Sequence, residues 1–145
     1  MRLGTTVQHP PQLIDALREE WRLAADTGAS VALALIESVH PDPQVLVALH
    51  WVLSRSCDAL LRTGHRSYAV IFPHTEFKGA KRVMDRFRMV LAALEPRDLA
   101  KPPSVAVGLA AFPAAGDHSL YLLVDDAHDA LMHDKAPPAP PKFVK

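Results

Sequence analysis

The sequence predicts an α/β fold in which helices flank a mixed central sheet. Segments with helical apolar spacing alternate with short apolar runs, and two of those runs are joined by a tight turn that predicts a hairpin. The chain has 145 residues, of which 49% are hydrophobic and 22% are charged, as expected for a globular protein with a buried core. We expect a single domain over residues 1–135 and a proline-rich tail over residues 136–145.

The first third of the chain predicts a helix, a strand and a second helix. The first helix begins at Pro10 and Pro11, where a missing N–H costs nothing, and stops at Asp26–Gly28. Its apolar residues recur at spacings of three and four: Leu13, Ile14, Leu17, Trp21 and Ala24. The continuous apolar run Val31–Ile36 predicts a strand buried on both faces. Residues 44–54 predict the second helix.

The two tryptophans are predicted to be buried. Trp21 and Trp51 lie on apolar helix faces, so we expect both in the core. Ala59–Arg62 and Ser67–Phe72 predict two paired strands, with a short turn at Gly64-His65.

A helix, a strand and a last helix complete the predicted order. Residues 77–91 have apolar residues at helical spacing and carry five basic residues on the opposite face. Residues 104–112 form an apolar run that predicts a strand, and residues 119–133 predict the last helix.

Charge is unevenly distributed although the formal net charge is zero. Residues 55–101 hold ten Lys or Arg and five acids, whereas residues 117–134 hold five acids and no Lys or Arg. This pattern fits either a basic centre that attracts a phosphate-bearing ligand or two solvated helix faces of opposite sign. We do not expect binding to polymeric nucleic acid, because the isoelectric point is about 7.1 and no basic run is rich in aromatic residues.

Other classes of protein are also disfavoured. No apolar run reaches the roughly 18 residues that a membrane helix needs, so we expect no membrane partner. Cys57 is the only cysteine, and no secretory signal is visible near the N-terminus, so we expect a cytoplasmic location. No cluster of histidines and acids has convincing spacing for a metal, so we expect neither a metal site nor a cofactor.

Five motifs, in order and closely spaced, resemble those of one known family. They are Arg55-Ser56-Cys57-Asp58, Gly64-His65-Arg66-Ser67-Tyr68 with the strand Ala69–Pro73, Ala80–Arg88, Val105–Ala110 and Ala127–Lys135. Together they resemble the GGDEF domain, the fold of diguanylate cyclases, over almost the whole chain. The resemblance implies a nucleotide-cyclase-like α/β fold and a role in cyclic di-GMP signalling in bacteria.

The signature motif itself is degenerate. In the family, this hairpin supplies acids for two divalent metals and holds GTP, but here Arg66 and Ser67 stand at the two acidic positions and His65 replaces the second glycine. A guanidinium repels the cation that an acid would bind. Glu37 falls where the family's first strand carries a metal-binding Asp, and Lys135 falls where the family contacts triphosphate. We therefore expect an inactive domain with no catalytic residues.

A ligand site is predicted from the same resemblance. Arg55-x-x-Asp58 is similar to the family's inhibitory site, which binds cyclic di-GMP, and Arg86 matches the arginine that completes it from the following helix. Arg82 lies one turn earlier on the same face. An Arg can pair with guanine or phosphate, and a carboxylate can accept from guanine N–H groups. The other interpretation is that Arg55 and Asp58 form a surface salt bridge or cap a helix end.

Two alternative functions remain open at this point. The first is a protein–protein interaction module, often a homodimer, that meets a signalling protein through Arg66, Lys78 and Arg88 and ignores nucleotides. The second is a residual nucleotide-processing enzyme that uses Glu37 and Lys135.

Overall fold

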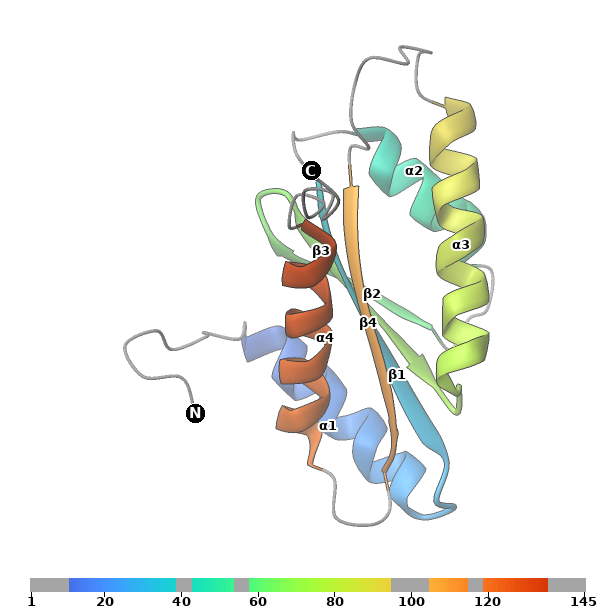
Figure 1. Cartoon of the computed structure of the whole chain (residues 1–145). Helices are drawn as coiled ribbons and strands as arrows, with labels where there is room; N and C mark the ends of the chain where they lie inside the picture. Colours follow the sequence, from blue (N-terminus) through green and yellow to red (C-terminus); the bar gives the residue numbers. More distant parts are fainter. Residues whose placement is uncertain (1–10, 39–42, 54–57, 95–104, 115–118, 136–145) are drawn as a thin grey trace, which may run out of the picture.

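The structure, a computed structural model, describes residues 11–38, 43–53, 58–94, 105–114 and 119–135. The helices and strands of this part follow the order predicted from the sequence (Figure 1). Their bounds are α1 (Pro11–Ala25), β1 (Ser30–Ser38), α2 (Pro43–Val52), β2 (Ala59–Gly64), β3 (Ser67–Pro73), α3 (Phe77–Leu94), β4 (Val105–Pro113) and α4 (Leu120–Lys135). The predicted tail, residues 136–145, lies outside the described residues.

The strands form one sheet in the order β2-β3-β1-β4. The α/β class with flanking helices is confirmed, but the expected mixture of parallel and antiparallel neighbours is wrong, because all three neighbouring pairs of this sheet are antiparallel. The reason lies in the connections. The helical connections through α2 and α3 each join two parallel strands, and in both cases an antiparallel strand lies between them. The sheet is thus two interleaved βαβ units.

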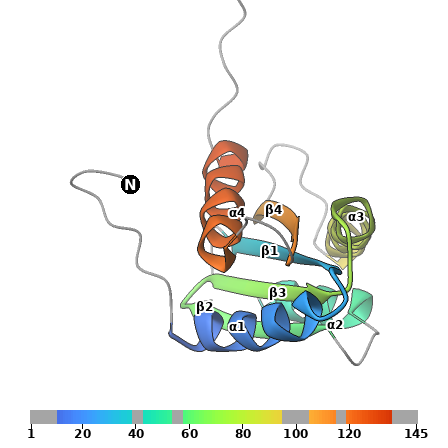
Figure 2. The ribbon, with the colours of Figure 1, turned by 90° about the horizontal axis from the view of Figure 1, so that it is seen from below.

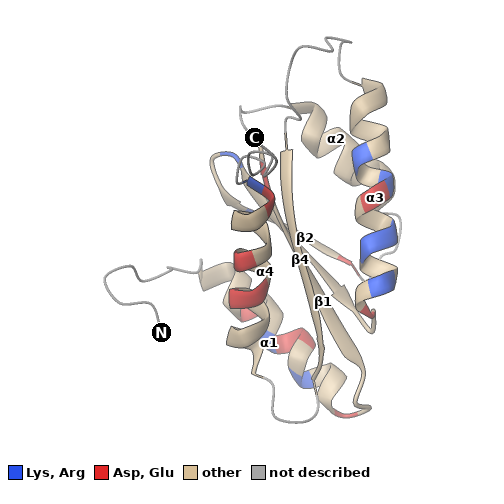
Figure 3. Cartoon of the chain, in the orientation of Figure 1, with Lys and Arg blue, Asp and Glu red and all other residues tan. Residues whose placement is uncertain are grey.

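The helices cover the sheet in two layers. Figure 2 shows α1 and α4 on one face of the sheet and α2 and α3 on the other. Charged residues occur along the helices, with Lys and Arg prominent on α3 and acidic residues on α4 (Figure 3). The molecule is therefore a three-layer sandwich with the sheet in the middle.

The central strand β1 explains why its sequence is apolar without interruption. Ala32, Ala34 and Ile36 point to the core shared with α2 and α3, whereas Val31 and Leu33 point to the core shared with α1 and α4. Successive side chains of a strand face opposite sides, so a strand between two helical layers needs apolar residues at every position. The prediction of a strand buried on both faces is confirmed.

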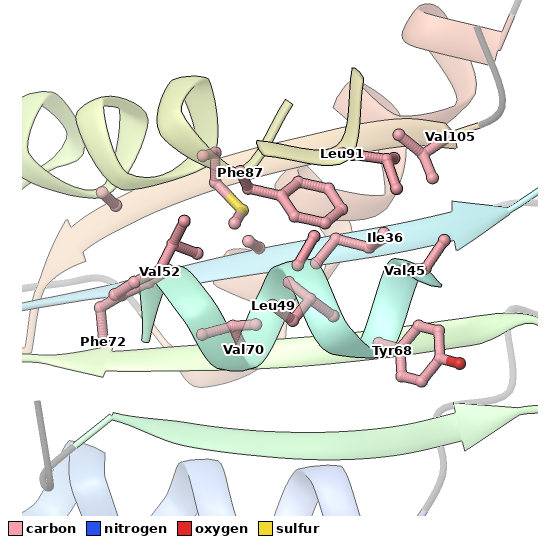
Figure 4. Packing of buried hydrophobic residues seen from close by; sticks show 14 of the residues in the cluster. Ile36, Val45, Leu49, Val52, Tyr68, Val70, Phe72, Phe87, Leu91 and Val105 are labelled. Carbon is pink, nitrogen blue, oxygen red and sulfur yellow. The ribbon is translucent and has the colours of Figure 1, made fainter. Parts of the chain in front are cut away.

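The core between the sheet and α2/α3 holds the larger side chains (Figure 4). Phe87 of α3 and Phe72 of β3 are fully buried there, and Leu49 of α2 packs in the same cluster. On the other face, Leu13 and Leu17 of α1 meet residues of α4 in a second cluster.

Trp51 is not in the core, contrary to the prediction. Its exposed fraction is 69%, whereas Trp21 is partly buried against the α1/α4 cluster. Helix α2 is apolar on nearly every side, since Leu46 and Val47 are exposed as well. The spacing of apolar residues therefore could not tell which side of α2 faces the sheet.

Helix α4 crosses β4 at a very short distance. A Cβ atom placed on Gly108 would lie 2.2 Å from the carbonyl oxygen of Ala127 and 2.3 Å from the amide nitrogen of Leu131. A glycine is needed at this position because the two backbones touch. The start of α4 is capped by Ser119, whose Oγ accepts a hydrogen bond from the amide of Leu122 at 3.3 Å.

In the described part of the chain, every helix is too short or too polar to cross a membrane.

Candidate functional site

The end of β1 and the β2–β3 turn meet at one edge of the molecule. Glu37 of β1 pairs in register with Ser67 of β3, and the amide of Ser38 donates to the carbonyl oxygen of Arg66 at 2.8 Å. The hairpin that resembles the GGDEF signature therefore lies directly beside the one strand residue that stands at a metal-binding position of the family.

The turn itself consists of His65 and Arg66, one residue later than the predicted Gly64-His65. A register shift between Arg62 and Gly64 causes the difference, because the extra residue moves the turn along the chain. Gly64 is the last residue of β2 and pairs with Ser67, whose Oγ would lie 2.5 Å from a Cβ at this glycine. The hairpin as such is confirmed.

Arg62 holds the turn from inside. Its Nε donates to the carbonyl oxygen of Gly64 at 3.2 Å, and its Nη2 donates to that of His65 at 2.9 Å. Arg62 was not among the predicted site residues, and its guanidinium hydrogen-bonds to the neighbouring backbone. No pattern in the sequence distinguishes such an arginine from a solvated one.

Lys135 and Glu37 form an ion pair at this same end of the sheet. Lys135 is the last residue of α4, and Glu37 is the penultimate residue of β1. These are the two residues that the residual-enzyme alternative requires. The structure does bring them together, and the carboxylate of Glu37 is occupied by the ammonium group of Lys135.

The described residues here do not fit the two divalent cations that the resemblance to GGDEF domains implies. Magnesium prefers several hard oxygen ligands in an octahedral arrangement. The turn offers His65 and Arg66, and Glu37 is paired with a cation. Across the part of the chain that the structure describes, no group of three or more His, Cys, Asp or Glu side chains could hold a metal ion.

Asp134 forms a second contact near the end of α4. One oxygen of its carboxylate, Oδ2, accepts from Arg88 of α3 at 2.9 Å and from the amide of Val107 on β4 at 2.9 Å. The bond to Arg88 links α4 to α3 across the edge strand β4, and the bond to Val107 satisfies a backbone N–H donor of β4. Arg88, predicted to belong to an interaction surface, is thus engaged within the molecule.

The other predicted site residues lie on α3 and before β2. Lys78, Arg82 and Arg86 are exposed on α3, and Asp58 is half-buried just before β2. Arg55 lies outside the described residues. Arg66 is at the hairpin turn, whereas Lys78 and Arg88 lie near the start and in the second half of α3.

Asp58 and the basic residues of α3 lie toward opposite edges of the sheet. Asp58 directly precedes β2, which is one edge strand, whereas α3 packs over β4, the other edge strand, and over β1. No hydrogen bond or ion pair joins Asp58 to Arg82 or Arg86 in the described structure, although Asp58 makes another contact. Successive strands are about 4.8 Å apart, so a ligand that contacts all three residues must span roughly 10 Å or more.

Comparisons with known proteins identify the fold. No protein-family model and no curated protein sequence matches the chain. Solved structures do match. The diguanylate cyclase SiaD of Pseudomonas aeruginosa, solved with its activator SiaC, is 22% identical, with a TM-score of 0.69 over 86% of this chain and 53% of that one. This chain thus spans about half the length of SiaD.

Two further matches cover nearly the whole of both chains. The active GGEEF domain of a diguanylate cyclase from Vibrio cholerae is 12% identical, with a TM-score of 0.71 over 88% of this chain and 90% of that one. The GGDEF domain of DgcB from Caulobacter crescentus, in complex with c-di-GMP, is 18% identical, with a TM-score of 0.68 over 93% and 92%. The predicted resemblance is therefore confirmed at the level of structure: this chain has the fold of GGDEF domains.

Proposed function

We propose that this chain is a GGDEF-like signalling domain that binds cyclic di-GMP without making it. Arg82 and Arg86 of α3 contact the ligand, together with Asp58 and Arg55. The domain acts in the cytoplasm, where GTP-derived messengers are found, and passes the signal to a partner protein.

The ion pair between Glu37 and Lys135 supports the proposal that the domain does not make cyclic di-GMP. Metal-assisted transfer of a nucleotidyl group needs anionic oxygens that hold the metals. Glu37 stands at the metal-binding position that the resemblance assigns to it, and its charge is neutralised by Lys135. The adjacent turn carries Arg66 at a position where the resemblance expects an acid, so a magnesium ion would find fewer anionic ligands here.

The exposed arginines of α3 support the proposal that the domain binds cyclic di-GMP. Within the described residues, neither Arg82 nor Arg86 has an acidic partner within 4.0 Å, and one helical turn separates them. Two guanidinium groups at this spacing can bind phosphate oxygens or the O6/N7 edge of guanine through paired N–H donors. Hydrogen bonds to charged groups contribute roughly 1.5–3 kcal/mol each, which corresponds to about a tenfold to hundredfold change in affinity for each arginine.

Calorimetric titration with cyclic di-GMP tests this proposal. We expect saturable binding to the unchanged protein and at least a tenfold weaker affinity for the Arg82→Ala/Arg86→Ala double variant. Arg22→Ala is the matched control, because Arg22 is also an exposed helical arginine but lies on α1, on the other face of the sheet. Absence of heat at high micromolar ligand, or equal affinities for the double variant and the unchanged protein, would refute the binding role.

A second candidate function is a protein-docking module that ignores nucleotides. It is favoured by the exposure of large apolar side chains on the same layer, since Met89 is 72% and Trp51 69% exposed. Trp, Met and Arg are enriched at the centres of protein interfaces. A complex with a signalling protein that forms equally well with and without cyclic di-GMP, and that is lost in Trp51→Ala, would support this candidate over the first.

A further inference from the structure

Helix α2 is apolar on the side that faces away from the sheet. Val45 and Leu49 pack inward, into the cluster shared with the sheet and α3 (Figure 4). On the outward side, Trp51 is 69% exposed, Val47 45% and Leu46 37%. Large apolar side chains gathered on one exposed surface mark a contact with another molecule, whereas scattered ones do not. We call this outward side the α2 face; it consists of Leu46, Val47, His50 and Trp51.

The α2 face also lacks acidic and basic residues. None of the ten residues of α2 is Asp, Glu, Lys or Arg. The outer side of α3, which packs beside α2, carries Lys78, Arg82 and Arg86, and none of these has an acid within 4.0 Å in the described part of the chain. Two copies that meet through α3 therefore repel each other, whereas two copies that meet through α2 bring no like charges together on this helix.

The side chains of the α2 face lie in two rows. Residues four apart on a helix lie in one row, so Val47 and Trp51 form one row, and Leu46 and His50 form the next. When two helices cross at about −50°, the rows of each helix fill the grooves between the rows of the other. A second copy of α2 presents the same two uncharged rows. A two-fold axis then places the α2 face of one copy against that of the other.

We propose that two copies of this chain form a two-fold dimer in which α2 packs against α2. Trp51 and Val47 of each copy lie at the centre of the contact, because they are the most exposed apolar residues of the face. Burial of their apolar surface drives the association. This interface goes beyond the proposed binding of cyclic di-GMP, since it uses none of the residues assigned to that ligand.

The size of the exposed face limits the strength of the dimer. At 69% exposure, Trp51 offers on the order of 170 Å² of surface, so the two tryptophans together supply on the order of 340 Å². Specific interfaces at the small end of the range bury less than about 1,200 Å² in total and belong to weak, transient complexes. We therefore expect a reversible dimer that forms at roughly 300 μM protein and dissociates at about 1 μM.

Analytical ultracentrifugation over this concentration range measures the association directly. We expect the average mass to rise from that of a monomer toward that of a dimer as the concentration increases. In Val47→Ala/Trp51→Ala, the dissociation constant should be at least tenfold higher. Met89→Ala is the matched control, because Met89 is 72% exposed but lies on α3, so this variant should dimerise like the unchanged protein.

The salt dependence tests whether the contact is apolar. Raising NaCl from about 0.1 M to about 1 M shortens the screening length from about 10 Å to about 3 Å, which weakens contacts between exposed charges. The average mass of the unchanged protein at roughly 300 μM should therefore not fall. A return to the monomer at high salt would show an interface made by charges and would overturn the proposal.

Chemical crosslinking locates the interface. Cys57 is the one native cysteine, so Cys57→Ser provides a background without thiols. In that background, Val47→Cys should give a covalent dimer with a short bis-maleimide. Leu122→Cys is the control, because Leu122 is 47% exposed on α4, on the other face of the sheet, and should stay monomeric. Covalent dimers from Leu122→Cys and none from Val47→Cys would overturn the proposal.

The proposed ligand site and this interface fail separately. Val47→Ala/Trp51→Ala leaves Arg82 and Arg86 in place, so this variant should keep any affinity for cyclic di-GMP while losing self-association. An unchanged protein that is still monomeric at roughly 300 μM would overturn the dimer and leave the α2 face to a different protein. A dimer that persists in Val47→Ala/Trp51→Ala would show another interface and would also overturn the proposal.

Discussion

Gly108 is the position at which the packing of α4 on β4 is most sensitive to a single added methyl group. A Cβ atom there would lie 2.2 Å from Ala127 O, 2.3 Å from Leu131 N and 2.7 Å from Leu131 Cα, all of them backbone atoms of α4. Real Cβ atoms essentially never approach another heavy atom within 3.0 Å. No change of rotamer relieves a clash with backbone, so α4 must move away by about 0.8 Å or more in a closely packed interior.

The cost of Gly108→Ala follows from this displacement. Adding atoms to a well-packed core typically costs 1–3 kcal/mol, and the backbone contacts place this substitution at about 3 kcal/mol. For a chain of this size, the melting temperature should fall by roughly 10 °C. The shift of α4 also pulls Lys135 from Glu37 and Asp134 from Arg88, so the end of the sheet that holds the hairpin loosens as well.

Thermal unfolding followed by circular dichroism measures the effect, with Gly79→Ala as the matched control. Gly79 lies in α3, and the nearest atom to its added Cβ is the methyl group of Thr75 at 3.3 Å, which belongs to a side chain. Alanine favours a helix over glycine by about 1 kcal/mol, so the control should melt at the same temperature or a few degrees higher. A Gly108→Ala protein that melts within about 2 °C of the unchanged one would refute the packing argument.

Two further predictions concern named contacts. Asp134→Ala removes the acceptor of both Arg88 and the Val107 amide, so the free energy of unfolding measured in urea should fall by about 1–2 kcal/mol. Arg88→Ala removes only one of these bonds and should lower the free energy of unfolding by less than about 1 kcal/mol. Equal losses in the two variants would contradict the role of the Val107 hydrogen bond. Phe87→Ala should cost about 3–5 kcal/mol because Phe87 is fully buried, and Trp51→Ala should stay within about 0.5 kcal/mol because Trp51 is exposed. A large loss of stability in Trp51→Ala would show that this side chain is part of the core.

The order of helices and strands could be predicted from the sequence because each element has a clear period. Strand β1 is apolar without interruption from Val31 to Ile36, and α3 has one apolar and one basic face, so both patterns have a single interpretation. The directions of neighbouring strands were not accessible in the same way. The directions depend on whether another strand lies between the two strands that each helix connects. The packing of the whole sheet determines this arrangement.

The details that differed from prediction share a physical cause, which is contact with distant parts of the chain. The side of α2 that is buried is decided by the sheet and α3, and Trp51 therefore faces solvent although its neighbours are apolar. The turn moves to His65 and Arg66 because the pairing slips between Arg62 and Gly64.

The candidate site was predictable only in part. The presence of Arg66 and Ser67 at the two positions where the resemblance expects acids is visible in the sequence. The ion pair between Glu37 and Lys135 is not, because it depends on α4 ending beside the last residues of β1. The close contact of α4 with Gly108 involves Ala127 and Leu131, so the position of Lys135 depends on packing one to two helical turns earlier in α4.

Incubation of the purified chain with GTP and either magnesium or manganese, followed by ion-exchange chromatography of the nucleotides, tests the proposed lack of cyclase activity most directly. The cations at the hairpin end and the pairing of Glu37 with Lys135 predict that GTP is recovered unchanged, with neither the linear dinucleotide intermediate nor cyclic di-GMP. Cyclic di-GMP that accumulates in proportion to the amount of this protein would contradict the proposal that the fold is retained without the cyclase reaction.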